Sequence, residues 1–450
     1  MTSALLPGGD DTIVAEATAA GRGAIAVIRL SGARATDVAR ALGASALTPR
    51  RATRVRLVHP TSGEPLDDAL VTWFAAPHSY TGEDVVELAT HGGRVAPARV
   101  LAACVAAGAR IAYAGEFTRR AVVHGKLDLL QAEAVADLID ARTSALQRVA
   151  LAQLDGGLSR RLLALREAVL ELEALLAYDV DFPEEDDGPI DRTRIADAAT
   201  GLRTQLSALL RTAPTGAMLR DGALVVLAGA PNAGKSSLFN ALLGDARAIV
   251  TPIAGTTRDA IEAVLDRAPV PLRLVDTAGL RETTDTLEQL GIEVSARYLA
   301  QAQVVLACGA SADEVAKTQQ AVAPLTAGVV LPVLTKADLH PALAADPTAV
   351  SAETGEGLAA LLARIDAALA QAAPAETDAV LITRERHRLG LTAALDEIQA
   401  FEAAWSDGAL PATVVAVHLY AARTALEELI GSVDVEDVLG RVFASFCIGK

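Results

Sequence analysis

One eight-residue stretch constrains this chain more than any other: Gly229-Ala-Pro-Asn-Ala-Gly-Lys-Ser236. It fits G-x-x-x-x-G-K-[ST], in which glycines let consecutive backbone N–H groups turn towards a phosphate and a helix N-terminus adds partial positive charge. The apolar run Leu224–Ala228 before it is typical of a buried parallel strand, and Ser237–Leu243 after it carries apolar residues at helical spacing. This context predicts that Lys235 reaches the β- and γ-phosphates of a nucleotide and that Ser236 ligates Mg²⁺.

A second motif predicts the metal-binding side of the same site. The apolar run Leu272–Val275 leads into Asp276-Thr-Ala-Gly279, which places an Asp for the Mg²⁺ shell and a Gly near the γ-phosphate. Between this motif and the phosphate loop lies Gly255-Thr-Thr-Arg-Asp259, a switch-like loop with hydroxyls for the metal. Both segments therefore indicate metal-assisted binding of a nucleoside triphosphate.

A third motif selects the base. Val329–Leu334 leads into Thr335-Lys-Ala-Asp338, and the Asp carboxylate can accept two hydrogen bonds from the N1–H and amino group of guanine. Adenine cannot offer that pair of donors. Ser351-Ala-Glu353 ends the next predicted strand and can support recognition of the base. Motifs in this order, each at a strand end, predict a Ras-like GTP-binding domain with a mainly parallel sheet.

Composition narrows the remaining possibilities. A length of 450 residues suggests about two to four domains, and 51% hydrophobic with 21% charged residues is typical of a globular chain. The net charge of −16 gives no overall electrostatic footprint for nucleic acid, so any RNA contact is expected from a local patch. Three cysteines without a C-x-x-C pair argue against disulfides and zinc and for a reducing compartment. Since no signal peptide or membrane span is visible, we expect a cytoplasmic protein.

Lysine is scarce: only five of the 40 basic residues are lysines. Where arginine serves as the generic surface charge, a remaining lysine indicates a need for a compact ammonium. Two of the five lie in the GTP motifs, which draws attention to Lys126 and Lys450. The five are Lys126, Lys235, Lys317, Lys336 and Lys450.

Residues 1–125 alternate short β-like runs with turn signals, which predicts an α+β domain. Polar side chains gather at the strand ends, and from spacing alone a solvated sheet edge explains them as well as a binding site does. These are Arg22, Arg29, Glu83, Asp84, Glu87 and His91. The predicted strands are 11–16, 24–30, 54–59, 69–74 and 84–89, with a helix over 97–107.

From Asp128 the pattern becomes helical, beginning with a capping-box-like Asp128 and Gln131. Further helices are predicted over 158–176, 191–211, 383–404 and 414–446. The simplest architecture is a helical domain split in sequence, 126–216 and 376–450, with a G domain over 217–375 inserted into it. Pro-Ala linkers near Pro214 and Pro374 favour both junctions.

The hydrolytic chemistry departs from that of Ras-type GTPases. Those proteins place a water-orienting Gln just after Asp-x-x-Gly, whereas Leu280 and Arg281 follow Gly279 here. Asn232 together with backbone carbonyls of the loop 249–255 forms a candidate site for a monovalent cation that replaces an arginine finger. Carboxylates that could orient the water are Glu282, Asp285 and Glu288.

With these pieces in place, the chain resembles the MnmE (TrmE) family of tRNA wobble-uridine modification GTPases over essentially its whole length. Beyond the G motifs, the pairing of a phosphate loop with a terminal Cys-Ile-Gly-Lys450 is very specific. The further motifs that carry the resemblance are Asp11-Thr-Ile-Val-Ala, Gly21-Arg-Gly, Ser79-Tyr-Thr-Gly-Glu-Asp-Val-Val-Glu-Leu, His91-Gly-Gly, Gly115-Glu-Phe-Thr, Lys126-Leu-Asp-Leu and Phe446-Cys-Ile-Gly-Lys.

The resemblance implies an N-terminal folate-binding domain that dimerises, a helical domain and an inserted G domain. It implies K⁺-stimulated GTP hydrolysis as two G domains meet across a homodimer. With the FAD-dependent partner MnmG, forming a heterotetramer or larger complex, such proteins add an aminomethyl or carboxymethylaminomethyl group at C5 of the wobble uridine of certain tRNAs. The implied ligands are GTP, Mg²⁺, K⁺ and 5-formyl- or 5,10-methylene-tetrahydrofolate.

Carried over by motif, the family implies specific roles. Glu288 would orient the attacking water, and Cys447 matches a cysteine required for modification. Ser236 and Thr257 would hold Mg²⁺; Asn232, Thr251, Ile253 and Thr256 would hold K⁺; Arg29, Glu87, Lys126 and Lys450 would surround the folate. The nucleotide-binding set is Asn232, Ala233, Gly234, Lys235, Ser236, Ser237, Thr251, Thr256, Thr257, Asp276, Thr277, Ala278, Gly279, Thr335, Lys336, Asp338, Ser351, Ala352 and Glu353.

Three positions depart from the family pattern. Thr335 replaces the usual Asn of N-K-x-D and so loses an amide that would brace the phosphate loop, although a hydroxyl can still hydrogen-bond. Ala114 replaces a Pro before Gly-Glu-Phe-Thr, and His124 stands where Asn is common. We expect guanine specificity through Asp338 to survive these changes.

Two other functions fit the G motifs alone. One is a regulatory GTPase switch in assembly of a ribosomal subunit or another particle, without one-carbon chemistry, because function lies in sites added to a fold. The other is a dimerising scaffold with residual GTP binding. Folate binding through Arg29 and Lys126 separates the first alternative from the tRNA-modifying enzyme, and hydrolysis that depends on Glu288 separates the second.

Overall fold

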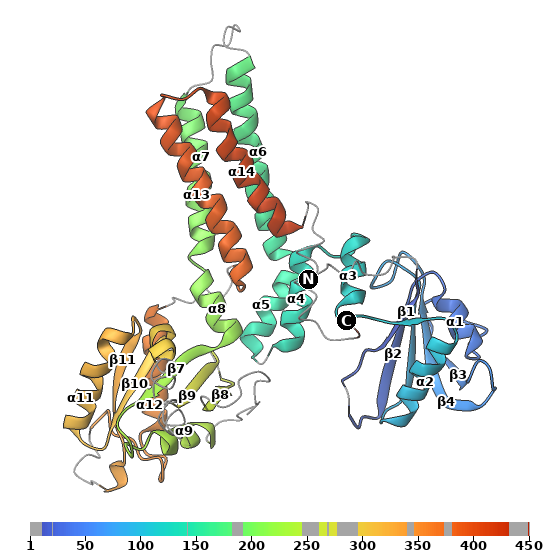
Figure 1. The fold of residues 1–450 in the computed structure, drawn as a ribbon, viewed down its shortest axis with the longest axis horizontal. Helices are drawn as coiled ribbons and strands as arrows, with labels where there is room; N and C mark the ends of the chain where they lie inside the picture. The colour runs from blue at the N-terminus through green and yellow to red at the C-terminus, as the bar shows by residue number, and fades with distance from the viewer. Residues whose placement is uncertain are drawn as a thin grey trace, which may run out of the picture. The chain divides into compact units, whose positions relative to one another are not determined.

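A computed structural model describes residues 11–19, 21–141, 143–181, 192–244, 261–267, 270–276, 296–339, 346–372, 380–431 and 449 (Figure 1). The chain forms two compact units. The first comprises Met1–Ala136, Leu154–Ser159 and Glu427–Lys450, and the second comprises Asp137–Gln153 and Arg160–Leu426.

The first unit is built on a six-stranded sheet in the order β3-β4-β5-β2-β1-β6. Its pairs are antiparallel except β1 with β6, which is parallel. All five predicted strands and the predicted helix are confirmed, whereas β6, α1 and α3 were not foreseen. The elements are β1 Ile13–Glu16, β2 Ile25–Ser31, α1 Ala35–Ala41, β3 Thr53–Val58, β4 Pro65–Phe74, β5 Val85–His91, α2 Val95–Ala106, β6 Arg110–Ile111 and α3 Glu116–Val123.

The two faces of this sheet have different roles. Alternation along the strands sends one set of side chains, such as Val14 and Ile28, into an apolar core with Val38 of α1 and Val100 of α2. The opposite face carries a smaller apolar cluster of Ile13, Ala15, Ala112 and Phe117. Arg29 of β2 and Glu87 of β5 alternate with the core residues of their strands and therefore lie on the second face.

The helices predicted over 158–176, 191–211 and 383–404 are confirmed, whereas α5 and α8 were not foreseen. The helix predicted over 414–446 ends at Ile430, and of the residues beyond it only Gly431 and Gly449 are described. The capping box is present: the Asp128 carboxylate accepts from the Gln131 backbone N–H at 2.8 Å, and the Gln131 side-chain oxygen Oε1 accepts from the Asp128 backbone N–H at 2.9 Å. No helix among the described residues is long and apolar enough to cross a membrane. The helices are α4 Leu129–Asp140, α5 Ser144–Leu154, α6 Gly157–Asp181, α7 Arg192–Leu210, α8 Ala213–Asp221, α13 Glu385–Asp407 and α14 Ala412–Ile430.

Helices α6, α7, α13 and α14 lie side by side in the second unit (Figure 1). Charged pairs join them on the outside, including Arg203 of α7 to Glu402 of α13 at 2.8 Å. Where α7 begins and α13 ends, the Arg192 guanidinium stacks on the Trp405 ring at 4.0 Å and donates to the Trp405 carbonyl at 2.8 Å. Inside, leucines and isoleucines such as Leu202 and Ile398 are buried. The segment after the G motifs therefore packs on helices that precede them.

The chain leaves and re-enters these helices at one place. The Ile382 N–H donates to the Thr212 hydroxyl at 3.1 Å, and a Cβ at Gly216 would lie 2.1 Å from the Ile382 carbonyl oxygen. The Arg384 guanidinium donates to buried Asp137 at 2.6 Å. The expected linker near Pro214 is instead the first turn of α8, where a proline fits because its missing N–H has no helical partner.

The G region contains a five-stranded sheet in the order β11-β10-β7-β9-β8. Only β8 runs antiparallel to its neighbour among the described pairs, so the predicted mainly parallel sheet is confirmed. Its elements are β7 Ala223–Ala228, α9 Lys235–Gly244, β8 Ile261–Leu265, β9 Leu272–Asp276, β10 Val304–Gly309, α11 Ala312–Val322, η2 Ala323–Leu325, β11 Val329–Leu334, η3 Ala337–Leu339 and α12 Leu358–Ala372.

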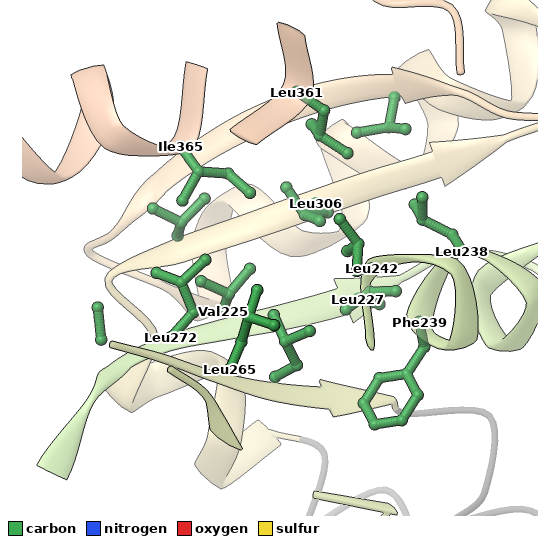
Figure 2. Packing of buried hydrophobic residues seen from close by; sticks show 14 of the residues in the cluster. Val225, Leu227, Leu238, Phe239, Leu242, Leu265, Leu272, Leu306, Leu361 and Ile365 are labelled. Carbon is green, nitrogen blue, oxygen red and sulfur yellow. The ribbon is translucent and has the colours of Figure 1, made fainter. Parts of the chain in front are cut away.

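Helices cover both faces of this sheet, and every residue of β7 and β10 is buried as a result. Figure 2 shows one face, where Val225 and Leu227 of β7 pack with Phe239 of α9 and Ile365 of α12. Alternate β7 residues such as Val226 face the second core with Leu299 and Val322. Strands buried on both faces leave their carboxyl ends as the place where polar loops gather.

Candidate functional site

The phosphate loop joins β7 to α9, as predicted. Gly229 has φ +155°, and a Cβ there would lie 2.4 Å from the Cys308 carbonyl oxygen at the end of β10. Asn232 and Gly234 have φ values of 63° and 77°. Left-handed residues at these positions curl the backbone into the concave form that presents N–H groups to an anion.

Lys235 reaches back over this loop. Its ammonium donates to the carbonyl oxygens of Gly229 at 2.9 Å and Ala230 at 2.8 Å, and the residue is only 5% exposed. The positive charge is therefore held at the mouth of the loop, where the phosphates of a nucleotide would lie.

Two predicted magnesium ligands, Ser236 and Asp276, are brought together. The Ser236 hydroxyl at the start of α9 donates to the Asp276 carboxylate at the end of β9 at 2.6 Å. Asp276 is buried and lies beside β7, opposite Leu227 in the strand register. A hydroxyl and a carboxylate at this separation are oxygen donors suited to Mg²⁺, so the residues present fit that ion.

The base-recognition loop is fixed by side-chain hydrogen bonds. The Ser351 hydroxyl, fully buried, donates to the Asp338 carboxylate at 2.7 Å and accepts from the Thr354 N–H at 3.1 Å. Lys336 adopts φ 59°, a left-handed turn between β11 and Asp338. Ser351 therefore orients Asp338, which is a more specific role than the general support that the sequence suggested.

Thr335 joins the base-recognition loop to the phosphate loop. Its hydroxyl lies 2.8 Å from the Ala233 carbonyl oxygen and 3.1 Å from that of Gly309. The hydroxyl thus occupies the bracing position for which the family pattern has an Asn amide.

Several predicted site residues lie outside the described part of the chain. They are Thr251, Ile253, Thr256, Thr257, Thr277, Ala278, Gly279, Glu288, Cys447 and Lys450. The described members of the predicted nucleotide-binding set that are exposed at the surface of the G region are Asn232, Ser236, Ser237, Asp338 and Glu353.

In the first unit, Arg29 and Glu87 face each other across β2 and β5. The Arg29 Nε donates to the Glu87 carboxylate at 3.0 Å, and the guanidinium lies 5.5 Å from the Tyr80 ring and 5.8 Å from the Phe117 ring. This pair is a charged spot bordered by aromatic rings on the sheet face that α1 and α2 leave uncovered.

Lys126 lies beside the loop that carries Tyr80. Its ammonium donates to the Pro77 carbonyl at 3.1 Å, and its chain runs against Gly82. The neighbouring His124 ring contacts the Thr81 carbonyl oxygen at 2.7 Å through Nδ1. The departure at His124 therefore keeps a polar contact with this loop.

Sequence reasoning missed a network of five charged side chains next to this region. Arg120 donates to Asp11 at 2.6 Å, to Glu83 at 3.0 Å and to Glu116 at 3.1 Å. Arg110 donates to Asp11 at 2.6 Å and to Glu116 at 2.7 Å. Glu83 is thus a partner of a buried arginine and not a solvated edge residue. The four-residue spacing of Glu116 and Arg120 on one helix was the available signal.

The network lowers the pKa values of the Asp11 and Glu116 carboxyl groups. Burial alone raises the pKa of Asp11 and Glu116, yet hydrogen bonds and charge from Arg110 and Arg120 leave both pKa values below their ordinary range. The carboxylates are therefore ionised and paired, which is the arrangement of a scaffold and not of a proton donor.

The described cysteines are unreactive. Cys104 and Cys308 are buried, and burial raises the pKa of each thiol to about 12. Within the described residues no group of three His, Cys, Asp or Glu side chains could hold a metal ion. Neither thiol can act as a nucleophile at neutral pH.

Comparison with known proteins finds relatives that match 98% of this chain. A family model described as "GTP-binding protein TrmE N-terminus" matches residues 12–126, and one described as "MnmE helical domain" matches residues 129–447. The curated tRNA modification GTPase MnmE of Azoarcus sp. (strain BH72) is 44% identical over 98% of both chains. The protein of that description from Methylobacterium radiotolerans is 45% identical, over 98% of this chain and 99% of its own.

Proposed function

The chain belongs to the MnmE (TrmE) family and is a tRNA modification GTPase, and on this premise we propose its reaction. It acts with an FAD-dependent MnmG partner to add an aminomethyl or carboxymethylaminomethyl group at C5 of the wobble uridine. The one-carbon unit comes from tetrahydrofolate, and K⁺ stimulates GTP hydrolysis. The observation that carries the GTPase part is the nucleotide site, in which Lys235, Ser236 and Asp276 converge at the ends of β7 and β9.

Each residue of this site has a distinct task. Lys235 neutralises phosphate oxygens, because its ammonium is already held over the loop by two carbonyls. Ser236 and Asp276 would hold Mg²⁺, which when bound neutralises charge on the phosphates. Asp338, oriented by Ser351, accepts hydrogen bonds from guanine. The attacking water is assigned to Glu288 and the K⁺ site to Asn232, Thr251, Ile253 and Thr256 by motif alone.

The folate assignment has separate support. Arg29 and Glu87 present a guanidinium and a carboxylate on one sheet face. A polar heterocycle that carries hydrogen-bond donors and acceptors side by side can form hydrogen bonds with both groups. Gly449 packs on the end of β1, since a Cβ there would lie 2.3 Å from the Glu16 carbonyl oxygen. That contact ties Gly449, the one described residue of the Cys-Ile-Gly-Lys motif, to the first unit, which contains Arg29, Glu87 and Lys126.

We further propose a cytoplasmic homodimer that binds tRNA together with MnmG. An acidic chain with net charge −16 repels phosphate overall, so the partner supplies most of the tRNA-binding surface in this account.

The test of the proposed reaction is nucleoside analysis. In a strain lacking the gene, tRNA should lose the 5-substituent of its wobble uridines, and the wild-type protein should restore it. Unchanged nucleosides on mass spectrometry would remove the reaction and favour a regulatory GTPase switch.

The proposed K⁺ site has a test of its own. GTP turnover by the purified protein should be much faster in K⁺ than in Na⁺ at equal ionic strength. Equal rates in the two salts would leave the GTPase but eliminate the cation mechanism.

A further inference from the structure

Thr335 is buried, 4% exposed, between the two loops that hold opposite ends of the nucleotide. We propose that its hydroxyl is a positioning group that sets nucleotide affinity through the phosphate loop and leaves base selectivity to Asp338. The inference rests on the proposed nucleotide site, and it assigns phosphate affinity and base selectivity to different residues of that site.

The hydroxyl has one proton and two neighbouring acceptors. The Ala233 carbonyl oxygen is nearer, at 2.8 Å, than the Gly309 carbonyl oxygen at 3.1 Å. The Gly309 carbonyl also accepts the Thr335 backbone N–H at 2.9 Å. Because the backbone already ties Thr335 to β10, the hydroxyl proton is available to the phosphate loop.

Packing reinforces this link. A Cβ at Gly234 would lie 3.3 Å from both Cβ and Oγ1 of Thr335, so the loop rests directly on this side chain. The loop meets β10 again at Gly229, beside the Cys308 carbonyl oxygen. Ala233 and Gly234 immediately precede Lys235 and Ser236, so movement of this segment displaces the groups that meet the phosphates and the metal.

Asp338 is held by different partners. The Ser351 hydroxyl and, through it, the Thr354 N–H fix its carboxylate, and the Ala337 N–H donates to the Val350 carbonyl at 3.3 Å. None of these hydrogen bonds includes the Thr335 side chain. Removing the hydroxyl should therefore weaken phosphate binding while the guanine contacts stay in place.

The experiment compares binding of GDP and IDP to the full-length protein by calorimetry. IDP lacks the 2-amino group that Asp338 accepts from, so the ratio of the two Kd values reports base selectivity. Thr335→Val keeps the shape without the hydroxyl and leaves a buried carbonyl without its donor, which should raise both Kd values about tenfold with an unchanged ratio. Thr335→Ser should stay within about threefold of wild type for both ligands, because it keeps the donor.

Asp338→Asn is the matched comparison, and it should instead lower the ratio of the IDP Kd to the GDP Kd towards one. Thr335→Ala serves as a second variant without the hydroxyl if Thr335→Val does not fold. Wild-type affinity in the folded hydroxyl-free variant, equal losses in Thr335→Ser, or a changed ratio in Thr335→Val would each overturn the inference. A wild-type protein that binds no GDP would instead refute the proposed nucleotide site itself.

Discussion

The nucleotide site and the charged network of the first unit solve the burial of polar groups in opposite ways. At the nucleotide site each polar side chain stands at a strand end and comes from a short local motif, such as Gly229–Ser236. In the network, Asp11 and Arg120 meet across 109 positions of sequence, and two arginines and three carboxylates satisfy one another. In the first arrangement the polar side chains remain available to a ligand. In the second they pair with one another and stabilise the fold of the domain.

The largest effect that would test this contrast is expected from Arg120→Ala. Removing the guanidinium leaves Asp11, Glu83 and Glu116 short of a partner, and breaking such buried pairs costs about 3–5 kcal/mol. Urea unfolding of the full chain should show that loss, and GDP binding should stay intact where the protein remains folded. Arg119→Ala, on the same helix but outside these contacts, is the control. Equal stability of the two variants would contradict the scaffold role.

Lys235→Ala should show the opposite behaviour to Arg120→Ala, because it should lose nucleotide binding and keep its stability. Loss of a charged hydrogen-bonding group at the phosphates should weaken GDP binding on the order of 100-fold, while the melting temperature of the nucleotide-free protein stays near wild type. Lys317→Ala on the exposed face of α11 is the matched lysine control. Retained GDP affinity in Lys235→Ala would refute the phosphate-loop assignment.

A smaller effect should follow from Ser351→Ala. Asp338 would keep its carboxylate but lose the hydroxyl that orients it, so GDP affinity should fall about fivefold, the size of one hydrogen bond. Calorimetry on this variant is compared with calorimetry on Ser144→Ala, which removes an exposed hydroxyl outside the nucleotide site. Equal GDP affinity of the two variants would show that Ser351 has no positioning role.

The smallest effect concerns pH. Asp11 and Glu116 have pKa values lowered from 3.8 and 4.5 in the folded state. A lowered folded pKa contributes stability above the unfolded value, and that contribution disappears as pH falls through the folded value. The free energy of unfolding should therefore drop below about pH 4.5, and less steeply in Arg120→Ala. Parallel pH profiles of wild type and variant would show that the arginine does not cause the shift.

Sequence and structure agree best where a function is encoded locally. The strand before Gly229, the helix from Lys235 and the pairing of Ser236 with Asp276 follow from motifs whose spacing fixes their geometry. The capping box of Asp128 and Gln131 is predictable for the same reason. Such features need no knowledge of distant residues.

The features that sequence reasoning missed depend on tertiary packing. Strand β6 is only two residues long, too short for a periodic signal, yet it places Arg110 beside Asp11. Glu83 looks like an edge residue until α3 brings Arg120 to it. The family pattern drew attention to Thr335, but its hydroxyl partner, the Ala233 carbonyl oxygen, lies about a hundred residues earlier in the chain. Contacts of this range cannot be read from local pattern.

The central claim of the proposed function is that the nucleotide site and the Arg29–Glu87 pair of the first unit serve one tRNA modification. The most direct measurement combines the wobble-uridine content of tRNA in a strain carrying Arg29→Lys with GTP turnover by the same purified variant. Lysine keeps the charge but loses the two-pronged contact with Glu87, so we expect the 5-substituent to be lost and GTP turnover to stay within about twofold of wild type. Normal modification by a folded Arg29→Lys protein would contradict the claim.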